Sequence, residues 1–260
     1  MNEDIISNVV QRTVHLYASK NDVFKGQATG FFIKYRNTYF LISAAHFAVL
    51  KDVTFNIVNG HPKDQDVKLS IIKELKFKKI RPVDLLKFQS IANWITDDLY
   101  CDEETYSSQE DVCFADLDTI PDIKQVHQKL VIGNNSFYIH EGLKTFTKTD
   151  LTTTPKKGDL YFTYGLTRGK NKRFGATTDS FYYGLKFNQY LENKFYMFKI
   201  NKTFNKDYNF KGLSGGPIFN QKLEIVGIVT YGIDPLDIEN IYVTPISIVK
   251  NMLDNRCFHP

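Results

Sequence analysis

Short runs of apolar residues recur along most of this chain, and polar or turn-forming residues separate them at close intervals. β-Branched and aromatic residues are concentrated in short runs, which occupy residues 13–17, 28–35, 38–43 and 53–58 in the first half and 160–165, 181–187, 195–200 and 225–231 in the second. Runs of this composition bounded by turn residues predict β-strands. We expect residues 30–35 and 39–43 to form a hairpin across Arg36-Asn37-Thr38. So many closely spaced strands predict an all-β barrel or sandwich.

Two segments depart from this pattern. Residues 89–110 are largely acidic and polar, and we expect them to form a long surface insertion before a further strand at 111–115. Residues 245–253 are the one segment that predicts a helix, because Pro245 suits a first turn and the apolar residues after it have helical spacing. The polar segment near 118–128 is the expected link between two halves, which we divide as residues 1–120 and 121–260.

The composition favours a folded soluble protein. The chain has 260 residues, of which 42% are hydrophobic and 14% aromatic, enough for one large domain or two small ones that share a core. A net charge of +4 is mild and spread along the chain, so we expect no nucleic-acid partner. No apolar run has the length of a membrane span or a signal peptide, and the three cysteines do not form a disulfide framework. We expect a cytoplasmic protein without a membrane partner.

Two short motifs carry the candidate chemistry. The first is Gly212-Leu213-Ser214-Gly215-Gly216-Pro217, a glycine-rich turn around one serine. The second is Ile42-Ser43-Ala44-Ala45-His46, in which an apolar strand ends in small residues followed by histidine. A serine hydroxyl is a poor nucleophile at neutral pH, and it needs a base within hydrogen-bond reach and donors that stabilise an oxyanion. Together the motifs resemble the two signature segments of the chymotrypsin/trypsin-like serine proteases, and the resemblance extends over almost the whole chain.

The resemblance implies an all-β fold of two antiparallel six-stranded β-barrels with a C-terminal helix. It implies that Ser214 is the nucleophile, that His46 is the general base, and that the N–H groups of Gly212 and Ser214 form the oxyanion hole. The histidine and an aspartate would belong to the first barrel and the serine to the second. The glycines allow the tight bend that such a loop requires, because a Cβ would obstruct it.

The third member of the triad has two candidates. In the family, the aspartate begins a buried strand of the form Asp-[Ile/Val/Leu]-Ala-[Leu/Val], and Asp111-Val112-Cys113-Phe114-Ala115 matches this form with Cys113 where a small residue is usual. Asp84 is the alternative, and its distance along the chain from His46 is closer to that in compact bacterial relatives. We favour Asp111, because the insertion before it accounts for the longer spacing. We expect Cys113 to be a small buried residue and not a second nucleophile.

The resemblance also implies a pocket that selects the side chain before the scissile bond. Its base would be Tyr208, one wall Thr230-Tyr231-Gly232, and another wall would lie near Asn240. A tyrosine at the base favours a small or medium apolar side chain, whereas the acidic residues at 234, 237 and 239 would attract a basic one. Both preferences stay open at this point.

The sequence departs from secreted trypsins in how it would be activated. Leu213 stands where those enzymes carry the aspartate that pairs with a newly cut N-terminus, and no Ile-Val-Gly-Gly cleavage site is present. Phe47 stands where they begin a disulfide. We therefore expect any regulation to come from a partner or from the ordering of a loop. The basic segment 168–173 could meet an acidic partner, but we favour a solvated turn.

The expected function is hydrolysis of peptide bonds in a protein or peptide substrate by an intracellular, bacterial-type serine endopeptidase with narrow or partner-controlled specificity. Some relatives act as effectors in stress or anti-phage defence, and such a role would involve an activating or target protein encoded nearby. The alternative is a catalytically silent trypsin-like binding module, and an esterase or viral processing enzyme of the same fold is a third hypothesis. We expect neither metal nor cofactor, because no His/Cys/Asp cluster has ligand spacing and no phosphate-binding glycine loop is present.

Overall fold

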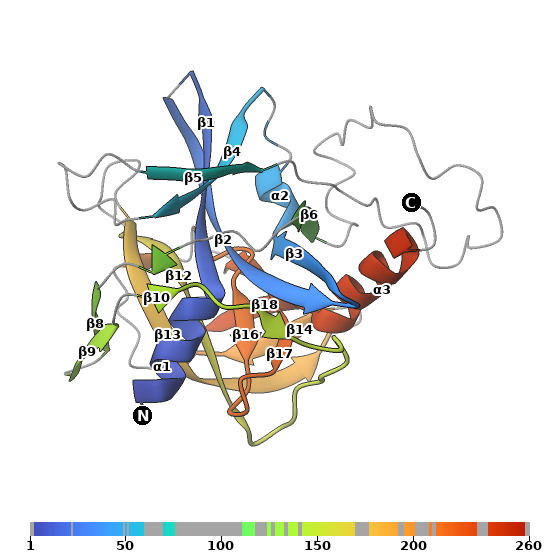
Figure 1. Ribbon diagram of the computed structural model, residues 1–260. Coiled ribbons are helices and arrows are strands. Elements are labelled where there is room, and N and C mark those ends of the chain that lie inside the picture. The colour runs from blue at the N-terminus through green and yellow to red at the C-terminus, as the bar shows by residue number, and fades with distance from the viewer. Residues whose placement is uncertain are drawn as a thin grey trace.

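The structure is a computed structural model. It describes residues 3–21, 23–48, 50, 52–59, 70–75, 111–117, 124–125, 128–132, 135–139, 142–169, 177–191, 195–200, 208–209, 212–232 and 239–257. Its helices are α1 (Glu3–Arg12), α2 (Ala45–Ala48) and α3 (Ile246–Cys257). Most other described residues lie in strands that form two large sheets, with the first sheet above the second in Figure 1.

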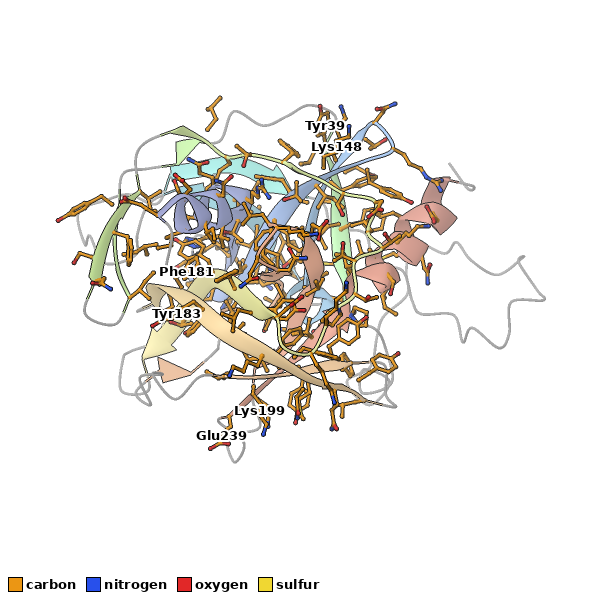
Figure 2. The ribbon with its side chains drawn as sticks, turned by 90° about the horizontal axis from the view of Figure 1, so that it is seen from below. Tyr39, Lys148, Phe181, Tyr183, Lys199 and Glu239 are labelled. Atoms are coloured by element: carbon orange, nitrogen blue, oxygen red, sulfur yellow. The ribbon has the colours of Figure 1, made fainter. Side chains whose placement is uncertain are left out.

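The first sheet comes almost entirely from the N-terminal half of the chain. Its strands are β1 (Thr13–Lys20), β2 (Val23–Tyr35), β3 (Thr38–Ser43), β4 (Thr54–Asn59), β5 (Ser70–Leu75), β6 (Cys113–Leu117) and β11 (Thr147–Lys148). The six strands other than β11 follow the order β5-β4-β1-β2-β3-β6 and all their pairings are antiparallel. β11 is added in parallel to the end of β2, at Ile33 and Lys34, and Figure 2 labels its residue Lys148.

The predicted hairpin is confirmed. β2 and β3 pair from Phe31 opposite Ile42 to Tyr35 opposite Thr38. The connecting residues Arg36 and Asn37 have φ angles of 46° and 66°. Two consecutive positive φ values are typical of the two-residue turn whose twist matches that of the flanking strands.

The second sheet closes on itself. Its strands are β12 (Leu160–Gly169), β13 (Thr177–Tyr190), β14 (Tyr196–Lys199), β15 (Tyr208–Asn209), β16 (Pro217–Phe219), β17 (Ile225–Gly232) and β18 (Asn240–Pro245). The order β13-β14-β18-β17-β16-β12 becomes a ring because β12 also pairs with β13, and β15 is added to β12. Two small antiparallel pairs precede this barrel, β7 (Lys124–Gln125) with β10 (Gly142–Leu143) and β8 (Gln128–Ile132) with β9 (Asn135–Ile139).

Three apolar clusters stabilise this arrangement. One fills the first sheet around Leu16, Phe32 and Leu41, and another fills the second barrel around Phe198 and Val229. The largest lies between them and contains side chains from both sheets, from α1 and from α3. Burial of apolar side chains is the main favourable term in folding, so this shared cluster fixes how the two sheets meet.

The helix prediction was incomplete, because α1 was not expected. Its apolar residues Ile6, Val9 and Val10 are fully buried in the shared cluster. Their spacing of three and four residues is a helical signal, but isoleucine and valine are also the residues that favour strands. α3 begins at Ile246, one residue later than predicted, and extends to Cys257.

The predicted all-β fold of two barrels with a C-terminal helix is confirmed. The boundary at residue 120 stays a prediction. That residue and the insertion predicted at 89–110 lie outside the described residues. Within the described ranges, the helices are too short or too polar to cross a membrane.

Candidate active site

Strand pairing in the first sheet brings His46 and Asp111 close together. β3 ends at Ser43, which is paired with Cys113, the first residue of the antiparallel strand β6. His46 follows β3 by three residues on the short helix α2, and Asp111 precedes β6 by two residues. Because the end of one strand is adjacent to the start of its antiparallel neighbour, both residues lie at the same end of this strand pair.

Asp111 contacts His46 through both carboxylate oxygens. Its Oδ1 accepts the backbone N–H of His46 at 2.7 Å, and its Oδ2 lies 2.6 Å from His46 Nδ1. The carboxylate is 7% exposed, whereas the imidazole is 41% exposed. A buried carboxylate on Nδ1 fixes the tautomer that leaves Nε2 as the proton acceptor, which is the state a general base requires.

Small residues allow this close packing. Ala44 and Ala45 are buried, and Cys113 lies against Ala45 and Ala48. The Cys113 thiol is fully buried and donates to the carbonyl of Ala44 at 3.3 Å. The sequence prediction that Cys113 is a small buried residue is confirmed.

Ser214 lies in a turn that is shaped by glycines. Gly212 and Gly215 have φ angles of +106° and +86°, in the left-handed region that favours glycine. The N–H of Gly216 donates to Leu213 O at 2.8 Å, and the N–H of Gly215 donates to Val229 O at 2.7 Å. The turn is thereby attached to β17, and fully buried Leu213 packs into the apolar core of the second barrel.

The turn around Ser214 also docks on the first sheet. The N–H of Thr29, on β2, donates to Ser214 O at 2.9 Å, and Ser43 Oγ donates to Thr29 O at 2.9 Å. A Cβ on Gly215 would overlap Thr29 O and Ser43 Oγ and would lie 2.8 Å from Ala44 N. The nucleophile candidate is therefore adjacent to the strand that ends just before His46.

Two N–H groups of the turn differ from those of Gly215 and Gly216, which are hydrogen-bonded. Within the part of the chain that the structure describes, the N–H groups of Gly212 and Ser214 have no hydrogen-bond acceptor. In the same part, no hydrogen bond joins the Ser214 hydroxyl to His46, a contact that in such sites often tightens only when a substrate binds. The pair of unoccupied donors is the arrangement that can stabilise an oxyanion.

The predicted pocket residues lie on three strands of the second barrel. Tyr208 is on β15, where its backbone pairs with Gly169. Thr230, Tyr231 and Gly232 end β17, and Asn240 begins β18. Thr230 is 2% exposed, and its Oγ1 donates to Tyr242 O and accepts from Thr244 Oγ1, each at 3.3 Å. The side chains of Tyr208 and Tyr231 lie outside the described residues, as does Asp84.

Sequence reasoning missed Thr29 and gave Ser43 no role. Thr29 is fully buried and contacts both halves of the site. A small polar residue between Ala28 and Gly30, directly before the apolar run Phe31-Phe32-Ile33, was the available signal. The partners of Thr29 cannot be inferred from that signal, because they lie far away along the chain.

Comparisons with known proteins show the fold. No protein-family model and no curated protein matches the sequence. The structure is similar to the serine endoprotease from Yersinia pestis, with a TM-score of 0.53 and 13% identity over 98% of this chain and 66% of that protein, so the chain spans just under two thirds of its length. It is also similar to the protein GrC, with a TM-score of 0.54 and 14% identity over 97% of this chain and 96% of GrC. The chain has the chymotrypsin-like double-barrel fold.

Proposed function

We propose that this protein is a serine endopeptidase that hydrolyses peptide bonds of a protein or peptide substrate through His46, Asp111 and Ser214. The observation that carries the proposal is the contact of buried Asp111 with His46, together with a turn that holds Ser214 and two N–H groups without acceptors among the described residues. A carboxylate-oriented imidazole beside a serine and an oxyanion hole is the arrangement for acyl transfer.

The proposed reaction has two steps. His46 Nε2 takes the proton of Ser214 Oγ as this oxygen attacks the carbonyl carbon, and the N–H groups of Gly212 and Ser214 stabilise the resulting oxyanion. The C–N bond then breaks, His46 gives its proton to the leaving amine, and an acyl-enzyme remains. His46 then takes a proton from water as this water attacks the acyl carbon, the bond between that carbon and Ser214 Oγ breaks, and His46 returns the proton to Oγ as the carboxylic acid product leaves. Asp111 stabilises the imidazolium in both steps.

We further propose that activity does not depend on insertion of a newly cut N-terminus. The residue before Ser214 is Leu213, which is fully buried among apolar side chains and offers no carboxylate to an ammonium group. The N-terminal helix α1 instead packs in the cluster between the two sheets. Control by a partner that alters access to the site is consistent with this arrangement.

A fluorophosphonate probe tests the proposal, because it forms a bond from Ser214 Oγ to phosphorus with loss of fluoride. We expect the wild type to be labelled, Ser214→Ala to be unlabelled, and Asp111→Ala to be labelled far more slowly than Asp84→Ala. The wild-type protein that reacts with the probe is then incubated, unlabelled, with a peptide library. Mass spectrometry of the products reports whether peptide bonds are cleaved and which residue is preferred before the cleaved bond.

Each outcome distinguishes between the hypotheses. Labelling without peptide cleavage would favour an esterase. A folded wild type that is not labelled at any probe concentration would contradict the proposed function and favour a catalytically silent binding module. Slow labelling of Asp84→Ala with unchanged Asp111→Ala would exchange the two aspartates in the proposed triad.

A further inference from the structure

We propose that the Thr29 hydroxyl positions the oxyanion hole, and that Thr29 is a positioning residue for the reaction. This inference rests on the proposed function and adds a residue that does not itself touch the substrate. Thr29 lies on β2 of the first sheet, whereas the N–H groups that it would position belong to the turn of the second barrel.

The Thr29 hydroxyl forms a hydrogen bond with each of two segments of the second barrel. Its Oγ1 donates to Gly212 O at 2.7 Å and accepts the N–H of Leu166, on β12, at 3.2 Å. One hydroxyl thus uses its donor and one lone pair, and a threonine or serine can make both bonds. Gly212 O shares a planar peptide group with the N–H of Leu213, and this group lies between the two that carry the N–H groups of Gly212 and Ser214. Fixing its direction therefore limits the rotation of the turn on both sides.

The backbone of Thr29 adds a second attachment to the same turn. Its N–H donates to Ser214 O, and its carbonyl accepts from Ser43 Oγ. The carbonyl groups of Gly212 and Ser214, the two residues that supply the oxyanion donors, are therefore both bound to Thr29. Among the described residues, the N–H groups of these two residues have no acceptor.

Two glycines make room for Thr29. A Cβ on Gly165, in β12, would overlap Thr29 Oγ1, and a Cβ on Gly215 would overlap Thr29 O. Gly165 is in a strand, where glycine is unfavourable unless another group approaches closely. The approach of the Thr29 hydroxyl is a reason for glycine at this position.

The chemical consequence follows from the geometry of transition-state stabilisation. An oxyanion hole is effective only when its donors are fixed in direction before the charge develops. Without the hydroxyl, Gly212 O and the N–H of Leu166 would each lose this partner, and the turn would be free to relax. The loss would slow the chemical step more than it would weaken the binding of the reagent.

The test compares fluorophosphonate inactivation of the full chain in the wild type, Thr29→Val and Thr29→Ser. Valine has nearly the same shape without the hydroxyl, and serine keeps the hydroxyl. We expect Thr29→Val to lower the maximal inactivation rate by about tenfold to hundredfold with little change in the half-saturating probe concentration. Thr29→Ser should recover most of the wild-type rate.

Thr13→Val is the matched control. Thr13 is also a fully buried threonine whose hydroxyl donates to a backbone carbonyl, that of Val9 at 2.8 Å, but at the end of α1. We expect this variant to react at the wild-type rate although its thermal unfolding temperature falls. If Thr29→Val does not fold, Thr29→Ala takes its place.

Several outcomes would overturn the inference. A folded Thr29→Val with the wild-type maximal rate, or a Thr29→Ser as slow as Thr29→Val, would exclude a role for the hydroxyl in the chemical step. Failure of both hydroxyl-free variants to fold, while Thr13→Val folds, would assign Thr29 a purely structural role. A folded wild type that is not labelled would instead contradict the proposed function, and this inference with it.

Discussion

His46 follows a strand of the first sheet and Ser214 lies in a turn of the second barrel, and different kinds of contact hold them in place. His46 is held by a side chain, because both oxygens of Asp111 contact it. The Ser214 turn is held mainly through its backbone, by the carbonyl and N–H groups of Gly212, Ser214, Gly215 and Gly216. The first arrangement depends on the chemistry of one residue, and the second depends on the absence of Cβ atoms.

This difference predicts different sensitivities to substitution. On the histidine side, a change of charge at constant shape should abolish function while the fold persists. On the serine side, the addition of a single methyl group should displace the backbone and affect function and stability together. The following experiments test that distinction.

Asp111→Asn should have the largest effect on rate. An asparagine can still accept the N–H of His46 through its amide oxygen, but its NH2 group then faces Nδ1 and can only donate to it, which places the ring proton on Nε2 and removes the base. We expect the fluorophosphonate reaction to slow by about 10⁴-fold. Samples quenched at successive times give the labelling rate, and circular dichroism checks that the variant is folded. A loss of less than tenfold would mean that Asp111 does not orient His46.

Gly215→Ala should affect both properties. The new Cβ would overlap Thr29 O and Ser43 Oγ at a residue whose φ is +86°. We expect a loss of about 2–5 kcal/mol in the free energy of unfolding and slower labelling by about 10²–10³-fold. Urea denaturation and the labelling rate measure the two effects.

Gly158→Ala separates strain in the backbone from steric overlap. Gly158 has a φ of +93°, and a Cβ there would meet nothing within 4 Å. We expect a cost of only about 1–2 kcal/mol, with labelling unchanged. Equal losses in the two glycine variants would show that docking on Thr29 and Ser43 is unimportant.

Asp254→Asn should have the smallest effect, although it also breaks ionic side-chain contacts. Asp254 lies on α3 and binds Tyr35, Arg36 and Lys250 at the other end of the β2–β3 hairpin from His46. Because these contacts are partly exposed, we expect a fall of at most about 2–4 °C in thermal unfolding temperature at pH 7 and no change in labelling. Slower labelling would show that this remote cluster affects the site.

The effect of Asp254→Asn should also depend on pH. Partial burial would raise the pKa of Asp254, but hydrogen bonds from Lys250 and Tyr35 and the charges of Lys250 and Arg36 outweigh it and lower the pKa below its ordinary value of 3.8. A lowered pKa in the folded state stabilises the protein above pH 3.8, and this contribution is lost as the pH falls through the folded value. The difference between wild type and variant should therefore shrink below that pH in acid denaturation.

The fold was largely predictable because strands and turns carry local signals. The hairpin around Arg36-Asn37 needed only its apolar runs and turn residues, whereas α1 was missed because its Ile and Val residues suit strands as well as helices. Spacing along the chain did not decide between Asp111 and Asp84, since it depends on the length of an insertion. Strand pairing places Asp111 against His46, which no local pattern expresses.

The contacts of Thr29 were beyond prediction for a related reason. Its hydroxyl binds Gly212, which is 183 residues away along the chain. A single buried threonine in a strand gives no indication of its partner on another sheet. The tightness of the turn itself was predictable, because glycines flank Ser214 in the sequence.

The bond from Thr29 to the Ser214 turn has a consequence for biosynthesis. The first sheet leaves the ribosome before the serine segment has been translated, and a chain of this kind folds its N-terminal part first. Neither part alone contains the geometry that the proposed reaction requires, because the turn is attached to both sheets. Under the proposed function, an unfinished or partly unfolded molecule therefore does not cleave the proteins around it. Proteolytic activity begins only when the two parts have docked on each other at the end of folding.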